Sequence, residues 1–290
     1  MAITTLRELL DASSAAGYAV GAFNVTSMVQ MKAAIEAAIR NKAPLIIQTS
    51  VSPTKFLGPA AWAAAYRALA DEAPVPVALQ LDHCTDVVFC KKCVDAGFTS
   101  VMIDASAQVF EENVHRTKEV CEHAHAKGAS VEGELGTIAG VEDQVKVTRS
   151  ESALCNPDKA AAFVHETGVD ALAPAIGTAH GIYITKDPEL HFGLLEEISA
   201  RVNGSGMRAP LVIHGGTGLP PDSVRRLVAL GGAKLNVSTE LKHVLIDATA
   251  EYLAAHSGEY DPGKVDIAVR DRTIEAIGVW MDLLGCAGRA

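Results

Sequence analysis

Residues 76–106, PVALQLDHCTDVVFCKKCVDAGFTSVMIDAS, decide the fold class. Two short apolar runs, 76–83 and 99–106, flank an amphipathic segment, 86–96, that stops at Gly97. Strands that are apolar along nearly their whole length are typical of parallel sheets, because helices cover both faces of such a sheet. The stretch therefore predicts two parallel strands joined by a helix.

The same pattern continues in both directions along the chain. Strands are predicted at 19–25, 44–50, 76–83, 99–106, 129–136, 170–177, 210–216 and 233–239, and helices at 27–41, 60–72, 86–96, 111–127, 157–167 and 220–230. About eight alternations predict a (β/α)₈ TIM barrel, with a doubly wound open sheet as the alternative. Residues 1–290 are expected to form one domain that ends in two extra helices within 239–285. Two long loops, 136–156 and 177–192, are expected at the mouth of the barrel.

Composition narrows the function further. The 290 residues include 25 Lys+Arg and 35 Asp+Glu, so the net charge is −10, and 49% of the residues are hydrophobic. This excludes a disordered chain and argues against a nucleic-acid partner. No apolar stretch approaches the roughly 20 residues of a membrane span, and no signal peptide is evident. Six Cys in a chain of this length indicate reduced thiols. A cytoplasmic enzyme is the expectation.

Three histidines occupy equivalent positions in the predicted barrel. His83 ends the third strand, His180 follows the sixth and His214 ends the seventh. Side chains at the carboxyl ends of barrel strands converge on one mouth. Three neutral imidazoles there would suit a zinc ion with one open position, which is the arrangement of a catalytic site. The alternative is that each His is a hydrogen-bonded residue of a strand end.

Carboxylates surround the same mouth. Asp82 precedes His83 and is a candidate general acid/base, or a partner that orients a ligand. Glu132 and Glu134 share one face of the fifth strand, and a buried carboxylate there needs a metal or a Lys or Arg as partner. Asp104 and Glu134 are candidates for the metal site or for a second cation, and Glu142 lies on the following loop.

Glycine-rich turns after the seventh and eighth strands predict a phosphate pocket. His214-Gly215-Gly216-Thr217-Gly218 leads toward a helix start at Pro220, and Asn236-Val237-Ser238-Thr239 precedes another helix. Glycines let backbone N–H groups approach an anion, and a helix N-terminus favours negative charge. No strand ends on a lysine, and Lys234 is near the start of its strand, so a Schiff-base mechanism is disfavoured.

With these features assembled, the chain resembles the class II, zinc-dependent ketose-bisphosphate aldolases, in particular the tagatose/fructose-bisphosphate branch. The similar segments include Leu81-Asp82-His83, 131–136, 175–181 and Asn236 to Thr239. The resemblance implies that His83, His180 and His214 hold zinc and that Asp82 moves the proton at the C4 oxygen. Residues implied to contact the sugar phosphate are Asn24, Ser50, Gly181, Gly215, Gly216, Thr217, Asn236, Val237, Ser238 and Thr239.

The resemblance also implies a homodimer or homotetramer, in which Arg270 of a neighbouring subunit could reach the second phosphate. The expected reaction is reversible aldol cleavage to dihydroxyacetone phosphate and an aldehyde, through a zinc-stabilised enediolate that Glu142 would protonate. The sequence leaves open whether a second metal ion or a monovalent cation also binds.

One departure from the family pattern bears on the substrate: Gly263 stands where the family often has Arg. The aldehyde could therefore be glyceraldehyde 3-phosphate or one without a phosphate, as in an aldolase for ketose 1-phosphates. Two other classes are weighed. An amidohydrolase-like enzyme needs a His-x-His pair on the first strand, which 21–24 lacks. A non-catalytic aldolase subunit would be expected to have lost a ligand or Asp82.

Overall fold

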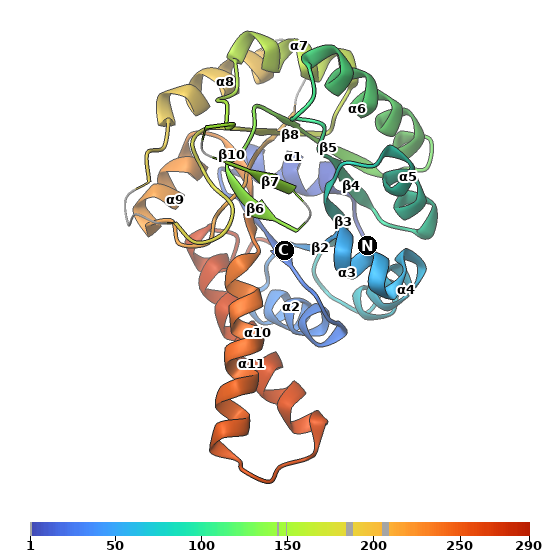
Figure 1. The fold of residues 1–290 in the computed structure, drawn as a ribbon, viewed down its shortest axis with the longest axis vertical. Helices are drawn as coiled ribbons and strands as arrows, with labels where there is room; N and C mark the ends of the chain where they lie inside the picture. The colour runs from blue at the N-terminus through green and yellow to red at the C-terminus, as the bar shows by residue number, and fades with distance from the viewer. Residues whose placement is uncertain (1, 144, 149, 184–187, 205–208) are drawn as a thin grey trace.

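The computed structural model describes residues 2–290 except 144, 149, 184–187 and 205–208. Eight parallel strands close into a barrel in the order β1, β10, β9, β8, β5, β4, β3, β2 (Figure 1). The TIM barrel is therefore confirmed, and each predicted run contributes one strand. The strands are β1 Val20–Asn24, β2 Leu45–Ser50, β3 Val77–Cys84, β4 Ser100–Ile103, β5 Ser130–Leu135, β8 Ala171–Pro174, β9 Leu211–Ile213 and β10 Gly232–Val237.

Helices surround the barrel (Figure 1). They are α1 Leu6–Ala16, α2 Met28–Asn41, α3 Val51–Leu57, α4 Pro59–Ala70, α5 Val87–Ala96, α6 Phe110–His125, α7 Pro157–Thr167, α8 Phe192–Gly204, α9 Pro221–Ala229, α10 Thr239–Ala255 and α11 Pro262–Leu283. All predicted helices are present, including the two that follow the last strand. Helices α1, α3 and α8 are additional to those predicted.

Helix α1 covers the end of the barrel opposite the mouth. Thr5 caps it by accepting from the N–H of Glu8, while the Glu8 carboxylate accepts from the N–H of Thr5. This reciprocal capping stabilises the first turn. The helix buries Leu6, Leu9 and Leu10 and contacts β1, β3, β5, β8 and β10. The barrel is therefore closed at this end, and a ligand has access from the other.

A buried carboxylate near α1 connects several elements at the end of the barrel opposite the mouth. Asp170, just before β8, accepts from the backbone N–H of Val131 at 2.7 Å and contacts Nε2 of His125 at 2.8 Å. Its other oxygen contacts Arg7 of α1 at 3.2 Å. These contacts join α1, β5, α6 and β8, so Asp170 is a structural residue away from the mouth.

A two-stranded hairpin crosses the mouth in front of the barrel (Figure 1). Strands β6 Gly140–Glu142 and β7 Val145–Val147 pair antiparallel within the long loop 136–156. The hairpin is held at both ends: the N–H of His180 donates to Ala139 at 2.8 Å, and the N–H of Ser52 donates to Asp143 at 2.7 Å. The two predicted long loops therefore contact each other directly beside His180.

Helices α10 and α11 pack against each other and project from the barrel (Figure 1). Helix α11 returns to pack on α2, which anchors the arm. Among the residues that the structure describes, no helix is long and apolar enough to cross a membrane. All six Cys are buried and free of disulfides, as the composition predicts.

Candidate metal centre and active site

The barrel brings its three predicted histidines together at the mouth. His83, His180 and His214 each offer a ring nitrogen, and these three nitrogens lie within 4.8 Å of one another. The ring centroids of His83 are 4.6 Å from those of both His180 and His214. His83 and His214 are buried, and His180 is half-buried. Three imidazoles converging in this way form a set of nitrogen donors suited to zinc.

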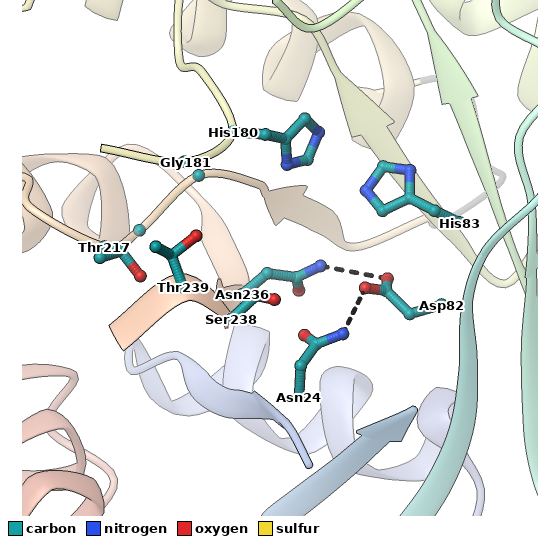
Figure 2. A pocket seen from close by; sticks show the side chains of 11 residues that line it. Asn24, Asp82, His83, His180, Gly181, Thr217, Asn236, Ser238 and Thr239 are labelled. Carbon is teal, nitrogen blue, oxygen red and sulfur yellow. Dashed lines mark hydrogen bonds between the residues drawn. The ribbon is translucent and has the colours of Figure 1, made fainter. Parts of the chain in front are cut away.

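A turn in the backbone explains how neighbouring side chains reach the same cavity. Consecutive strand residues normally point to opposite faces. His83 has a φ of 45°, in the left-handed region, and the pairing of β3 with β4 shifts register between Leu81 and Cys84. The strand therefore twists at its end, and Asp82 and His83 both line the pocket (Figure 2).

Hydrogen bonds orient two of the rings. Nδ1 of His83 contacts Asp104 at 3.1 Å, and Nε2 of His214 contacts Glu132 at 2.9 Å. The remaining nitrogens, Nε2 of His83 and Nδ1 of His214, face each other at 2.8 Å. Two lone pairs cannot approach so closely unless a proton lies between them. Without a bound ion, a proton therefore lies between Nε2 of His83 and Nδ1 of His214, and both nitrogens would be metal donors if that proton left.

The electrostatics identify the ring that carries this proton. Burial by itself would lower the pKa of His83, but the charge of Asp82 and the hydrogen bond to Asp104 raise that pKa to about 10. Burial lowers the pKa of His214 to about 4. His83 is therefore the cation and His214 the neutral ring at pH 7. Asp104 is the counter-charge of His83. Despite burial, the contact with His83 lowers the pKa of Asp104 to about 2.

A second group of donors lies behind His83. His83, Asp104 and Glu134 also bring three ligand atoms within 4.8 Å of one another. One oxygen of Glu134 is buried without a hydrogen-bond partner among the described residues. Burial and the nearby charge of Asp104 raise the pKa of Glu134 well above its usual range. A buried, unsatisfied carboxylate of this kind is suited to a cation.

Three side-chain amides hold Asp82. Asn24 donates to one carboxylate oxygen at 2.8 Å, while Gln48 and Asn236 donate to the other at 3.1 and 3.5 Å (Figure 2 shows Asn24 and Asn236). The carbonyl oxygens of the same three amides have no hydrogen-bond partner among the described residues. Asp82 is therefore fixed in position by uncharged donors, and unsatisfied acceptors beside it are available to ligand hydroxyl groups.

The predicted anion loops line the opposite side of the pocket (Figure 2). Gly215 has a φ of 71°, and a Cβ there would lie 2.3 Å from the carbonyl oxygen of Ala179. The hydroxyl of Tyr183 donates to Gly215 at 2.7 Å, and Thr217 accepts from the N–H of Glu240 in the first turn of α10. Close packing thus brings the glycine loop, the loop after β8 and the N-terminus of α10 together.

Most of the predicted substrate residues line this one pocket. They are Asn24, Gly181, Gly215, Gly216, Thr217, Asn236, Ser238 and Thr239, together with Asp82, His83 and His180. Ser50 ends β2 in register with Asp82, and Val237 is fully buried in β10. Arg270 does not line the pocket; on α11 it contacts Asp271 and Glu36. The backbone of Glu142 lies in β6, but its side chain is outside the described part of the chain.

Two contacts at the site go beyond the sequence analysis. Lys234 reaches Glu132, which in turn contacts His214. The position of Lys234 early in its strand suggested a residue remote from the mouth, but the side chain extends along the barrel interior. Gln48, which holds Asp82, was not predicted either. The available signal was an amide that directly follows the apolar residues 45–47 of its strand.

Comparison with known proteins agrees with this site. The family model described as fructose-bisphosphate aldolase class-II matches residues 4–289, almost the whole chain. The chain belongs to this family. Class II aldolases are carbon–carbon lyases that depend on zinc, and three converging histidines are consistent with that metal requirement.

Relatives of this class II aldolase match over their full lengths. It is 40% identical over 294 residues to a probable fructose-bisphosphate aldolase of Bacillus subtilis, covering all of both chains. It is 38% identical to the fructose-bisphosphate aldolase of Geobacillus stearothermophilus, covering all of this chain and 99% of that one. The crystal structure of the YdjI aldolase of Escherichia coli K12 superposes with a TM-score of 0.86 at 29% identity, covering 99% of each chain.

Proposed function

We propose that this class II aldolase catalyses the reversible, zinc-dependent cleavage of a ketose bisphosphate into dihydroxyacetone phosphate and glyceraldehyde 3-phosphate or a related aldehyde. The observation that carries the proposal is the convergence of the ring nitrogens of His83, His180 and His214, where His83 and His180 line one pocket with Asp82. The names of the full-length relatives support a fructose bisphosphate as substrate.

Each group of residues in the site has its own proposed role in the reaction. His83, His180 and His214 hold zinc, which when bound supplies Lewis acidity for the negative charge that the ketone oxygen gains as the C3–C4 bond breaks. Asp82 takes the proton of the C4 hydroxyl in cleavage and returns it in condensation. Asn24 and Asn236 position Asp82, and their free carbonyl oxygens accept from substrate hydroxyls. Glu142, on the hairpin over the mouth, is the proposed donor to the carbon.

The phosphate of dihydroxyacetone phosphate binds where the glycine loop meets α10. Gly181, Gly215 to Thr217, and Asn236 to Thr239 surround this part of the pocket, Val237 through its backbone. Small residues let an anion approach the backbone, and the dipole of α10 favours negative charge. Asp104 and Glu134 form a buried site for a second cation.

The contacts of Arg270 bear on whether the substrate carries a second phosphate. Its guanidinium contacts Asp271 at 2.7 Å within the same chain, and Gly263 supplies no charge. Recognition of a second phosphate therefore depends on a neighbouring subunit. If none provides it, the preferred substrate is a ketose 1-phosphate whose aldehyde product is uncharged.

Self-association as a homodimer or homotetramer fits the arm formed by α10 and α11. Its exposed apolar side chains are Ile246, Leu253, Tyr260, Ile267 and Val279. We expect a neighbouring chain to cover these side chains in the oligomer. The acidic charge and the six buried free thiols support a cytoplasmic location without nucleic-acid or membrane partners.

A cleavage assay over ketose bisphosphates and ketose 1-phosphates, with and without zinc, tests the proposal. We expect turnover of fructose or tagatose bisphosphate that requires zinc, with the better epimer identifying the C4 stereochemistry. Faster turnover of a 1-phosphate would assign the second substrate class. Absence of cleavage for every compound by protein that contains zinc would contradict the lyase proposal and indicate a non-catalytic subunit.

Zinc binding is expected to release about one proton per ion at pH 7. His83 and His214 would have to give up the proton between their facing nitrogens to hold a metal ion, and the pKa of His83 is raised to about 10. Apparent affinity should therefore rise about tenfold per pH unit up to that value and then level off. Calorimetry in buffers of different ionisation enthalpy measures the released proton. A binding enthalpy independent of the buffer would count against this account.

A further inference from the structure

A buried chain of charged groups lies behind His214 inside the barrel. Nζ of Lys234 contacts Oε2 of Glu132 at 2.7 Å, and Oε1 of Glu132 contacts Nε2 of His214 at 2.9 Å. The side chains of all three residues are completely buried. Gln80 also donates to Oε2 of Glu132, at 2.8 Å. Lys234 therefore reaches the histidine cluster through Glu132, which contacts His214 directly.

The direction of these hydrogen bonds is fixed. The ammonium group of Lys234 lies 2.7 Å from Oε2 of Glu132, and the amide of Gln80 donates to the same oxygen at 2.8 Å. Glu132 is therefore a carboxylate that can only accept. Lys234 and Gln80 both donate to Oε2, so Oε1 is left for His214. Nε2 of His214 must carry the proton, and the lone pair of Nδ1 faces His83.

Stability alone does not explain this ion pair. Burying two charges costs several kcal/mol of desolvation, and an apolar pair of similar volume is often as stable. The other oriented ring, His83, has a simpler partner, because the free oxygen of Asp104 accepts from Ser106 and not from a cation. The lysine therefore has a function beyond that of a hydrogen-bond donor for a carboxylate.

We propose that Glu132 and Lys234 act together as positioning residues for the metal ligand His214. Glu132 holds the ring in the tautomer whose Nδ1 can bind a metal ion. Lys234, by holding Oε2, determines which end of the side chain at position 132 faces the ring. The inference rests on the proposed zinc site and adds two residues that do not touch substrate.

Glu132→Gln provides the decisive test, because the side chain keeps its shape while one of its two acceptor oxygens becomes an NH₂ donor. Lys234 and Gln80 should retain the amide oxygen, which turns the NH₂ group toward His214. The ring must then accept at Nε2, so its proton moves to Nδ1 and points into the ion site. We expect zinc affinity to fall by about 10- to 100-fold. In protein labelled with ¹⁵N-histidine, the signals of His214 should change from the Nε2–H to the Nδ1–H tautomer.

Adding Lys234→Met to Glu132→Gln should reverse part of the effect. Without the cation, the amide can turn its oxygen toward the ring, and we expect at least tenfold recovery of zinc affinity over the single variant. Asp170→Asn is the matched control, since Asp170 is the carboxylate partner of His125 at the other end of the barrel. It should lower the melting temperature and leave zinc affinity within about twofold.

Zinc affinity and a His214 tautomer unchanged in Glu132→Gln would overturn the inference. If the double variant does not fold, circular dichroism will show it, and the ¹⁵N spectrum of the single variant still decides. A wild-type protein that binds no zinc at its histidines would instead refute the proposed function. The tautomer of His214 in the ion-free protein would then still report on Glu132.

Discussion

Replacing Asp82 with Ala is expected to lower the turnover of ketose bisphosphate by about 10²- to 10⁴-fold, the range for loss of a positioned acid/base. Zinc content should stay at the wild-type level, because Asp82 is outside both groups of metal-binding side chains. Steady-state kinetics together with metal analysis of the purified variant measure the two effects. The three groups that hold Asp82 are amides, which cannot replace it as an acid/base.

Asp222→Ala is the control for this prediction, because Asp222 is an exposed carboxylate on α9 that pairs with Arg225. It should turn over substrate like the wild type. Loss of zinc from Asp82→Ala would show that Asp82 has a structural role in the metal site. Full activity with zinc retained would assign the C4 proton to another group.

Removal of the metal is expected to lower cleavage by at least about 10³-fold, since Lewis-acid stabilisation contributes several kcal/mol and each 1.36 kcal/mol is a factor of ten. Zinc added back to chelator-treated wild-type protein should restore the rate. His180→Ala should lose both zinc and activity, and added zinc at comparable concentrations should not rescue it. Rate assays paired with metal analysis measure these outcomes.

His165→Ala is the matched histidine variant, because His165 is exposed in the last turn of α7. It should bind zinc and cleave substrate normally. Chelator-treated enzyme that works at the full rate after complete metal removal would refute the metal role. Zinc binding by His180→Ala at wild-type affinity would mean that other side chains form the site.

The barrel could be predicted because its strands are buried on both faces and are therefore apolar along nearly their whole length. The hairpin β6–β7 could not, since strands of three residues are too short to establish a periodicity. The start of helix α1 is indicated in the sequence by Thr5 and Glu8, the two residues of its capping box.

The parts of the site that lie at the carboxyl ends of strands could be predicted from the sequence. His83, His180 and His214 converge because the carboxyl ends of parallel strands meet at one mouth. The contact of Lys234 with Glu132 was missed, since position along a strand fixes the Cα and not the reach of a four-carbon side chain. The role of Arg270 depends on a second chain, which a single sequence cannot place.

The sequence distance between the metal ligands has a kinetic consequence. His83 and His214 are 131 positions apart, and strands β4, β5, β8 and β9 must assemble before their rings can meet. Non-local contacts of this kind form late in folding. Zinc should therefore bind the completed barrel and not partly folded chains, so it is expected to slow unfolding while leaving the early steps of refolding unchanged.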